Sequence, residues 1–163
     1  MLLLDNLLVA EQVQENKGGN KMLVDLLNVV IYSVLGVILM MIGCFLVDLA
    51  IPCDFPEEIK KGNQAVGFIM AGASIAIGII VKSAVMSPAV ATVVEQTLLE
   101  GITGTLLYSA AGIILCILGY LIMLLFNRKY NLNDEIGKGN TAAGIMIMGM
   151  FIGLGIVISG VIY

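Results

Sequence analysis

The chain has 163 residues, of which 60% are hydrophobic and 12% are charged, and its mean hydropathy is +1.05. Soluble domains have about half apolar and about a quarter charged residues, so this composition is typical of a membrane protein and excludes a water-soluble core. The net charge of −4 says little about partners. No basic run of the kind that contacts nucleic acid is present, so nucleic acid is not predicted as a partner.

Residues 1–24 form a leader that is too short and too interrupted to cross a membrane. Asp5 breaks its apolar start, MLLLDNLLVA, and no basic segment or cleavage pattern typical of a signal peptide is present. Two interpretations stay open: an interfacial amphipathic helix with Asp5, Glu11 and Glu15 on its wet side, or a loosely packed segment.

Four apolar runs follow the leader, and each is long enough for a membrane span of about 20 residues. They cover residues 26–47, 65–86, 102–126 and 141–162, and none contains an internal proline. Apolar runs in lipid form helices, because an open strand would leave its backbone polar groups unpaired. The sequence therefore predicts an all-α, polytopic membrane protein with four transmembrane helices.

The four predicted spans come as two copies of one pair. The segment YSVLGVILMMIG at 32–43 returns as YSAAGIILCILG at 108–119, and EIKKGNQAVGFIMAG at 58–72 returns as EIGKGNTAAGIMIMG at 135–149. The copies are offset by 76 residues in the first helices and by 77 in the second ones. We expect repeat 1 at 25–87 and repeat 2 at 102–163, as parallel tandem repeats related by a pseudo-twofold axis along the membrane normal.

Lysine and arginine placement predicts the orientation. The connections inside the repeats hold five basic residues, whereas the leader holds Lys17 and Lys21, and the connection between the repeats holds only the acidic Glu95 and Glu100. This pattern favours a prokaryotic inner-membrane protein with both repeat-internal loops in the cytoplasm and both termini outside. The five residues are Lys60, Lys61, Arg128, Lys129 and Lys138.

Glycines recur on matching helix faces of the two copies. Helices in lipid have no hydrophobic drive to associate, so small residues that allow close backbone approach are a common packing device. We expect these glycines to form helix–helix contacts, and glycines that line a narrow pore are the alternative. The set is Gly36, Gly43, Gly72, Gly112, Gly119, Gly149 and Gly153.

A Lys-Gly-Asn triplet precedes the second helix of each copy. Asn63 and Asn140 are predicted N-caps, because an asparagine side chain accepts hydrogen bonds from the first free N–H groups of a helix. Two such helix starts, with Lys61 and Lys138 beside them, are also a candidate site for an anion or a headgroup phosphate. In a further interpretation, Glu58 and Glu135 pair with these lysines and hold the loop closed; these residues are Glu58, Lys61, Asn63, Glu135, Lys138 and Asn140.

Two charged residues at the boundaries of the spans occur in the first copy only. Asp48 ends the first span, where repeat 2 has leucine, and Lys82 lies near the end of the second, where repeat 2 has Ser159. Charges within a membrane are costly and are candidates for function. Lys82 is long enough to extend its amine to the interface, so a structural role is equally supported for it.

No catalytic, cofactor or metal site is predicted. Histidine is absent, and Cys44, Cys53 and Cys116 do not have the spacing of metal ligands. No paired intramembrane carboxylates and no Ser/Lys dyad are evident, so an intramembrane enzyme is not expected.

The run VDLAIPCDFPEEIKKGNQAVGFIMAG resembles a bacterial inner-membrane family called domain of unknown function 350. The residues that carry the resemblance are Asp48, Pro52, Glu58, Asn63, Ala65 and Gly72, with Glu135, Asn140, Ala142, Gly144 and Gly149 in the second copy. It covers about residues 30–163. The resemblance implies a small four-helix membrane protein of two tandem units, and it implies no reaction.

Two functions are therefore carried forward. The first is a non-enzymatic, homo-oligomeric membrane scaffold or a subunit that partners other membrane proteins, which the glycine-rich helix faces favour. The alternative is a small-ion channel or transporter, which Asp48 and the duplicated Lys-Gly-Asn helix starts favour.

Overall fold

The computed structural model describes residues 2–87, 98–126 and 131–163, with side chains from Lys21 onward. The chain divides into two compact units, Met1–Leu35 and Gly36–Tyr163, which we describe separately. The first unit is the beginning of α1 (Leu2–Ala50), one helix that holds both the leader and the first predicted span. The described backbone of the leader is thus helical, and its location at a membrane interface stays a prediction.

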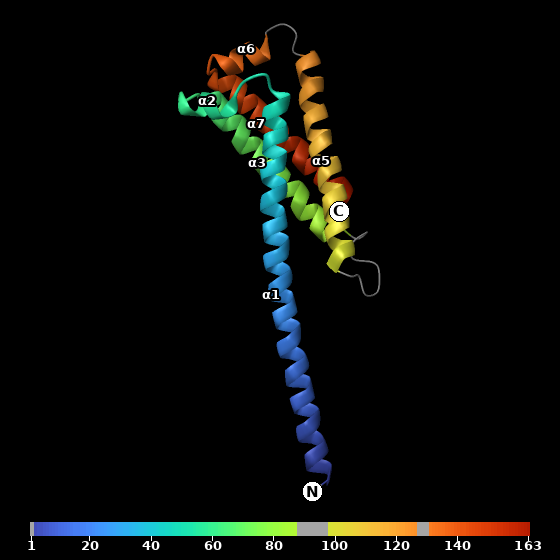
Figure 1. Ribbon diagram of the computed structural model, residues 1–163. Helices are drawn as coiled ribbons and strands as arrows, with labels where there is room; N and C mark the ends of the chain where they lie inside the picture. The colour runs from blue at the N-terminus through green and yellow to red at the C-terminus, as the bar shows by residue number, and fades with distance from the viewer. Residues whose placement is uncertain (1, 88–97, 127–130) are drawn as a thin grey trace. The chain divides into compact units, whose positions relative to one another are not determined.

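In its described residues, the second unit contains the end of α1 and five more helices (Figure 1). These are α2 (Phe55–Lys60), α3 (Gln64–Met86), α5 (Leu98–Phe126), α6 (Leu132–Gly137) and α7 (Thr141–Ile162). The short helices α2 and α6 were not predicted, because six residues are too few to show a helical period.

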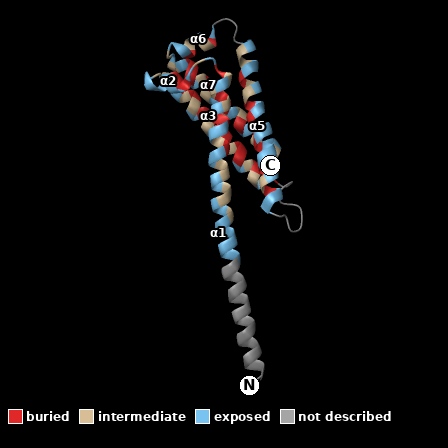
Figure 2. Cartoon of the chain, in the orientation of Figure 1, coloured by how far each residue is buried: buried red, intermediate tan, exposed pale blue. Residues whose placement is uncertain are grey.

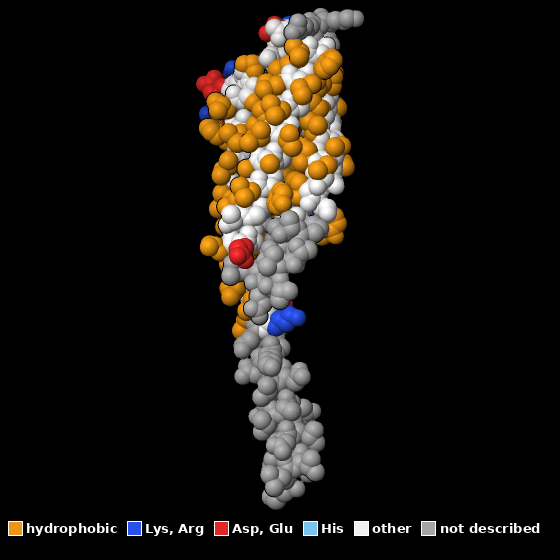
Figure 3. Space-filling model, turned by 90° about the vertical axis from the view of Figure 1, so that its right-hand side faces the viewer, with side chains coloured by type: hydrophobic (Ala, Val, Ile, Leu, Met, Phe, Trp, Pro, Cys, Tyr) orange, Lys and Arg blue, Asp and Glu red, His pale blue; other side chains and the backbone are white. Residues whose placement is uncertain are grey.

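Four helical segments in the described residues are long and apolar enough to cross a membrane: Lys21–Ala50, Gln64–Met86, Leu98–Phe126 and Thr141–Ile162. The prediction of an all-α fold with four transmembrane helices is confirmed. In Figure 3 apolar side chains cover the flank of the helices, while charged side chains lie at the end that carries the connections and, singly, toward the opposite end. Glu95, Arg128 and Lys129, which enter the orientation argument, lie outside the described residues.

Helices α3 and α7 form the most extensive helix pair of this unit. Their backbones approach so closely that a Cβ on Gly144 would lie 2.5 Å from the Ala65 Cα, and one on Gly72 would lie 2.6 Å from the Met148 Cα. Further along, a Cβ on Gly155 would lie 2.8 Å from the Ala76 Cα. The contacts advance in the same direction along both helices, so α3 and α7 run parallel and start at the same end.

Within each repeat the two long helices pack as an antiparallel hairpin through matching residues. A Cβ on Gly36 of α1 would lie 3.6 Å from Val81 of α3, and one on Gly112 of α5 would lie 3.4 Å from Ile158 of α7. About two helical turns further along α1 and α5, Gly43 faces Ile77 and Gly119 faces Leu154. The four positions in contact in repeat 1 are equivalent to the four in repeat 2. Each hairpin therefore packs equivalent glycines against equivalent side chains.

The packing between the repeats is not the twofold arrangement expected from the sequence. A twofold axis would repeat the contact of Gly144 with Ala65 as a contact of Gly67 with Ala142. A Cβ on Gly67 would instead find no atom within 4 Å, and the same holds for Gly149. Helices α3 and α7 therefore meet through different faces, and each keeps the equivalent of its partner's face exposed.

The buried core is formed mainly by α3 and α7, and residues of α1, α2, α5 and α6 complete it (Figure 2). Half of the most apolar 18-residue window of α3 is buried, against 22% of the corresponding window of α7. At the connection end, the buried ring of Tyr120 stacks on Phe151 with centroids 6.1 Å apart, and its hydroxyl donates to the Asn133 Oδ1 at 2.7 Å. The equivalent positions in repeat 1 are the small Cys44 and Ser74, whose side chains are 3.3 Å apart.

We expect Gly144→Ala to destabilise the fold and its repeat equivalent Gly67→Ala to leave it intact. The added methyl at 144 overlaps the α3 backbone, which costs about 1–3 kcal/mol, whereas alanine at the open position 67 gains up to about 1 kcal/mol of helix propensity. Unfolding in mixed micelles, with the protein dilute enough to be monomeric, measures both changes. Equal effects of the two substitutions would contradict the packing described above.

Candidate functional site

The candidate site is the pair of connections at the shared end of α3 and α7, and a Lys-Gly-Asn triplet shapes each connection. Gly62 and Gly139 have positive φ angles of 78° and 79°, which glycine adopts without strain. The amides that follow α2 bond back to it, Gly62 N–H to the Ile59 carbonyl and Asn63 N–H to the Glu58 carbonyl, at 3.0 and 2.9 Å. This is a Schellman motif, and the same bonds end α6, so a glycine is required at both places.

The asparagine that completes each motif also starts the following long helix. Asn63 Oδ1 accepts from the N–H groups of Ala65 and Val66 at 3.0 and 3.3 Å, and Asn140 Oδ1 accepts from Ala142 at 3.1 Å. One residue therefore ends the short helix and begins the long one, so the chain turns sharply with its end groups satisfied.

A glutamate on each short helix binds both ends of its triplet. Glu58 accepts from the Lys61 amine and the Asn63 amide, both at 2.8 Å, and Glu135 accepts from Lys138 at 3.0 Å and Asn140 at 2.7 Å. These bonds are the ones expected if each glutamate pairs with the lysine of its own loop. Each lysine amine is 64% or more exposed, so each ion pair contributes little by itself.

These bonds shift the titration of the groups that make them. The Asn63 amide, followed by Lys61, lowers the pKa of Glu58, and Asn140 followed by Lys138 does the same to the pKa of Glu135. Because these pKa values are depressed, the stabilisation is fully present above the ordinary glutamate pKa and is lost as the pH falls through the lowered value. The two carboxylates are thus charged at neutral pH.

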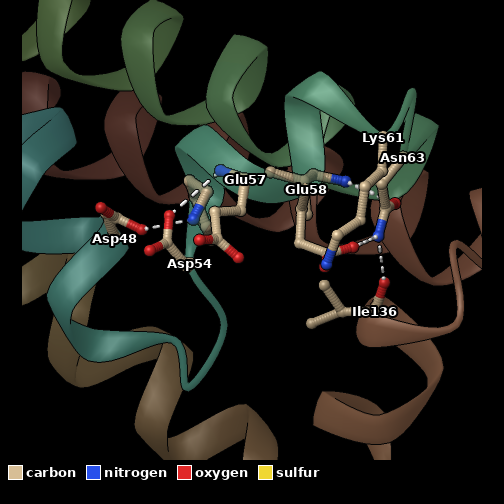
Figure 4. Close-up of polar contacts among 9 residues, drawn as sticks. Asp48, Asp54, Glu57, Glu58, Lys61, Asn63 and Ile136 are labelled. Carbon is tan, nitrogen blue, oxygen red and sulfur yellow. Dashed lines mark hydrogen bonds and ion pairs between the residues drawn. The ribbon is translucent and has the colours of Figure 1, made fainter.

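One bond that only the first connection makes joins the two repeats (Figure 4). The Asn63 amide also donates to the Ile136 carbonyl on α6 at 2.9 Å, in addition to its bond to Glu58. Asn140 makes the bond to Glu135 but has no equivalent bond to the Ile59 carbonyl among the described residues. Nearby, Gln64 accepts from the Thr141 hydroxyl at 3.3 Å.

Asp48, which only repeat 1 has, bonds to the start of α2. Its Oδ1 accepts from the Phe55 N–H at 3.1 Å, and Asp54, the N-cap of α2, accepts from the Glu57 N–H at 3.1 Å (Figure 4). Pro56, between them, has no N–H. The first three positions of α2 thus leave no amide unsatisfied, whereas Asn131 at the same place on α6 makes no side-chain cap.

The acidic side chains around the start of α2 also affect Cys53. Burial, followed by the charges of Glu58, Asp48 and Asp54, raises the pKa of the Cys53 thiol to about 11. A thiol with such a pKa stays protonated and unreactive at neutral pH. The described residues contain no group of three or more His, Cys, Asp or Glu that could hold a metal ion.

A polar hollow of about 440 Å³ lies between the two connections. Its walls carry Lys61 and Lys138 and, from the first connection, Glu58 and Asn63. The N–H groups that an anion would bind at the two helix starts already have asparagine acceptors. Among the described residues the hollow therefore offers the positive charge of two lysines, while the helix amides that would bind an anion are already bonded within the chain. The lining residues are Glu58, Lys61, Gly62, Asn63, Gln64, Gly137, Lys138 and Gly139.

The remaining predicted residues lie apart from this site. Pro52 is exposed in the turn after α1, and Lys82 is exposed near the other end of α3. Gly149 and Gly153 are exposed on α7, with no atom within 4 Å of a built Cβ. The Ile136 carbonyl could not be predicted as a partner of Asn63, because main-chain acceptors carry no sequence signal.

We expect Asn63→Ala to destabilise the protein more than Asn140→Ala. Both changes remove a helix cap and a bond to glutamate, but only the first leaves the Ile136 carbonyl without its donor. The difference should be about 1–2 kcal/mol, measured by unfolding in micelles. Asn63→Asp keeps the cap acceptor but loses both amide bonds and places a second carboxylate beside Glu58, so it should stay destabilised. Full recovery by aspartate would exclude a contribution of the amide bonds to Glu58 and Ile136.

Comparisons with known proteins agree with this architecture. The model of the family Domain of Unknown Function (DUF350) matches residues 21–162. The chain is 28% identical over 124 residues to a UPF0719 transmembrane protein of Aquifex aeolicus (strain VF5), an alignment that covers 75% of this chain and 44% of that relative. The chain thus spans less than half the length of this curated relative. No solved structure matches.

Proposed function

Because the chain belongs to the DUF350 family and is a multi-pass membrane protein, we propose that it acts through assembly, as a homo-oligomeric scaffold or partner subunit without enzymatic activity. The observation that carries this proposal is the set of small residues left open on α3 and α7. Gly67, Gly78, Gly149 and Gly153 are exposed, and a Cβ on any of them would find no atom within 4 Å. A glycine in a transmembrane helix serves packing only when another helix approaches it.

The polar groups at the membrane boundary support the same proposal. Asp48, Glu58 and Asn63 each make bonds inside the chain, which gives them structural roles. Neither the family nor the relative indicates an enzyme.

The chain should be oligomeric in a lipid bilayer. Reconstitution in nanodiscs at several protein-to-disc ratios, followed by mass measurement of single discs, should show a preferred copy number above one. A copy number that follows random loading at all ratios would contradict assembly.

We also propose that α2 and α6 face the cytoplasm of a prokaryotic cell, with the chain in the inner membrane. Support comes from Lys60, Lys61 and Lys138 in these connections, since basic residues favour the cytoplasmic side. In a cysteine-free chain, the exposed position of Lys60→Cys should react with an impermeant maleimide in inverted vesicles and remain unlabelled in intact spheroplasts. The reverse pattern would overturn the orientation.

A small-ion channel or transporter is the second candidate, which one observation favours. The Ser109 hydroxyl on α5 is fully buried and has no hydrogen-bond partner among the described residues; a hydrated path that opened beside it would supply the missing partner. Ion flux into liposomes distinguishes the candidates: a channel requires flux above that of empty liposomes that falls in Ser109→Ala. Flux equal to that of empty liposomes leaves assembly as the function.

A further inference from the structure

The contact between α3 and α7 uses two different faces, and each repeat carries both of them. Face 1 is the surface that α3 presents to α7, and face 2 is the surface that α7 presents to α3. In repeat 1, face 1 consists of Ala65, Gly72 and Ala76, and in repeat 2, face 2 consists of Gly144, Met148 and Gly155.

The remaining pair of faces is open. Face 1 of repeat 2 consists of Ala142, Gly149 and Gly153, and face 2 of repeat 1 consists of Gly67, Ala71 and Gly78. All six residues are exposed, whereas Ala65, Gly72, Ala76, Gly144 and Gly155 are buried. One chain therefore contains one joined pair of these faces and one unjoined pair.

We propose that a second copy of this chain joins the open pair, so that face 1 on α7 of one copy packs against face 2 on α3 of the next. This inference rests on the proposed assembly function and specifies its interface. Equivalent positions give the expected contacts: Ala142 with Gly67, Gly149 with Ala71, and Gly153 with Gly78. Each copy offers both faces, so the contact is heterologous, and it repeats from copy to copy until it closes into a ring.

A hollow on α7 independently marks the place of the missing partner. A cavity of about 300 Å³ is lined by Glu135, Asn140, Ala142, Ala143 and Met146. The equivalent residues of repeat 1 include Ala65, Val66 and Ile69, which are all 0% exposed, and Ala65 lies against Gly144 of repeat 2. The hollow is thus the site that repeat 2 occupies on repeat 1, left empty on repeat 2.

The connections also contain one interaction between the repeats whose equivalent partners are left without each other. Ile136 on α6 is buried and its carbonyl accepts from Asn63, whereas its equivalent Ile59 on α2 is 49% exposed. Asn140 has one amide hydrogen that makes no bond among the described residues. In the proposed contact, Asn140 of one copy donates to the Ile59 carbonyl of the next, which would fix the register of the two copies.

The proposed contact also agrees with the membrane. Because α3 and α7 run parallel within the chain, a repeat of their contact between chains places every copy in the same orientation in the bilayer. The neighbouring hairpin fits as well: Ile80 of α3, which a Cβ on Gly112 of α5 would meet, is 0% exposed, while its equivalent Val157 on α7 is 65% exposed. Val157 would meet Gly36 of the next copy.

Cysteine crosslinking in membranes tests the pairing. Two differently tagged chains, each with Cys44, Cys53 and Cys116 replaced by alanine, carry Ala71→Cys and Ala142→Cys respectively and are expressed together; both positions already carry a Cβ, so neither change blocks the contact. A short bifunctional maleimide should give a dimer that contains both tags, and each variant expressed alone should remain uncrosslinked. Ala71→Cys with Ile122→Cys, an exposed position on α5, is the control pair and should give no product.

The possible results separate the interface from the assembly. Crosslinking of Ala142→Cys to itself would show a symmetric contact through α7 and would overturn the proposal. No product from a chain that is oligomeric in nanodiscs would place the interface elsewhere, with another membrane protein or lipid on these faces, and would also overturn it. A monomeric chain in nanodiscs would remove the assembly function itself.

A blocking substitution gives a second readout. Gly149→Leu should weaken self-association by about tenfold or more, because the side chain fills the space that the next copy's α3 requires. It should lower neither the helical circular dichroism nor the monomer's stability, since no atom of the chain lies within 4 Å of that Cβ and leucine favours the helix over glycine. Unchanged self-association in this variant would contradict the proposed interface.

Discussion

The close approach of the α3 and α7 backbones is the constraint on which the second unit depends. In lipid, burial of apolar surface gives helices no reason to associate, so stability comes from van der Waals contact and from hydrogen bonds between helices. Gly144 and Gly72 let the two backbones come within contact distance, and α5 then packs against both helices. The same approach brings the two helix starts together, which places the Asn63 amide at the Ile136 carbonyl.

Much of this architecture follows from local sequence signals. The apolar runs predict the four spans, and asparagine before an apolar helix predicts the caps at 63 and 140, since both signals act over a few residues. The pairing of the repeats could not be predicted, because Gly67 and Gly144 occupy equivalent positions in the two copies and only Gly144 meets another helix. Repetition in sequence indicated a shared fold of the hairpins, and it carried no information on which of two small-residue faces each helix would use.

The differences between the repeats have a structural basis at the connection. Asp48 has no equivalent in repeat 2 and binds the first amide of α2, whereas α6 begins without a side-chain cap. Helix α6 has a different support: its buried Ile136 lies against repeat 1 and its carbonyl receives Asn63. Helix α6, which repeat 1 contacts, thus begins without a carboxylate bound to its first amide, whereas α2, which has no such contact among the described residues, begins with Asp48 bound to its first amide.

The aromatic pair of repeat 2 makes the interior of the second hairpin different from that of the first. Tyr120 and Phe151 fill the space at the connection end of the second hairpin, and the first hairpin holds only Cys44 and Ser74 at the same positions. A chimaera built from two first hairpins would lack both rings and the Asn133 that binds Tyr120, leaving a void where the rings now stack. One built from two second hairpins would have to fit two rings where a thiol and a hydroxyl now lie. The duplicated halves have therefore diverged into parts that cannot replace each other, although their glycines still match.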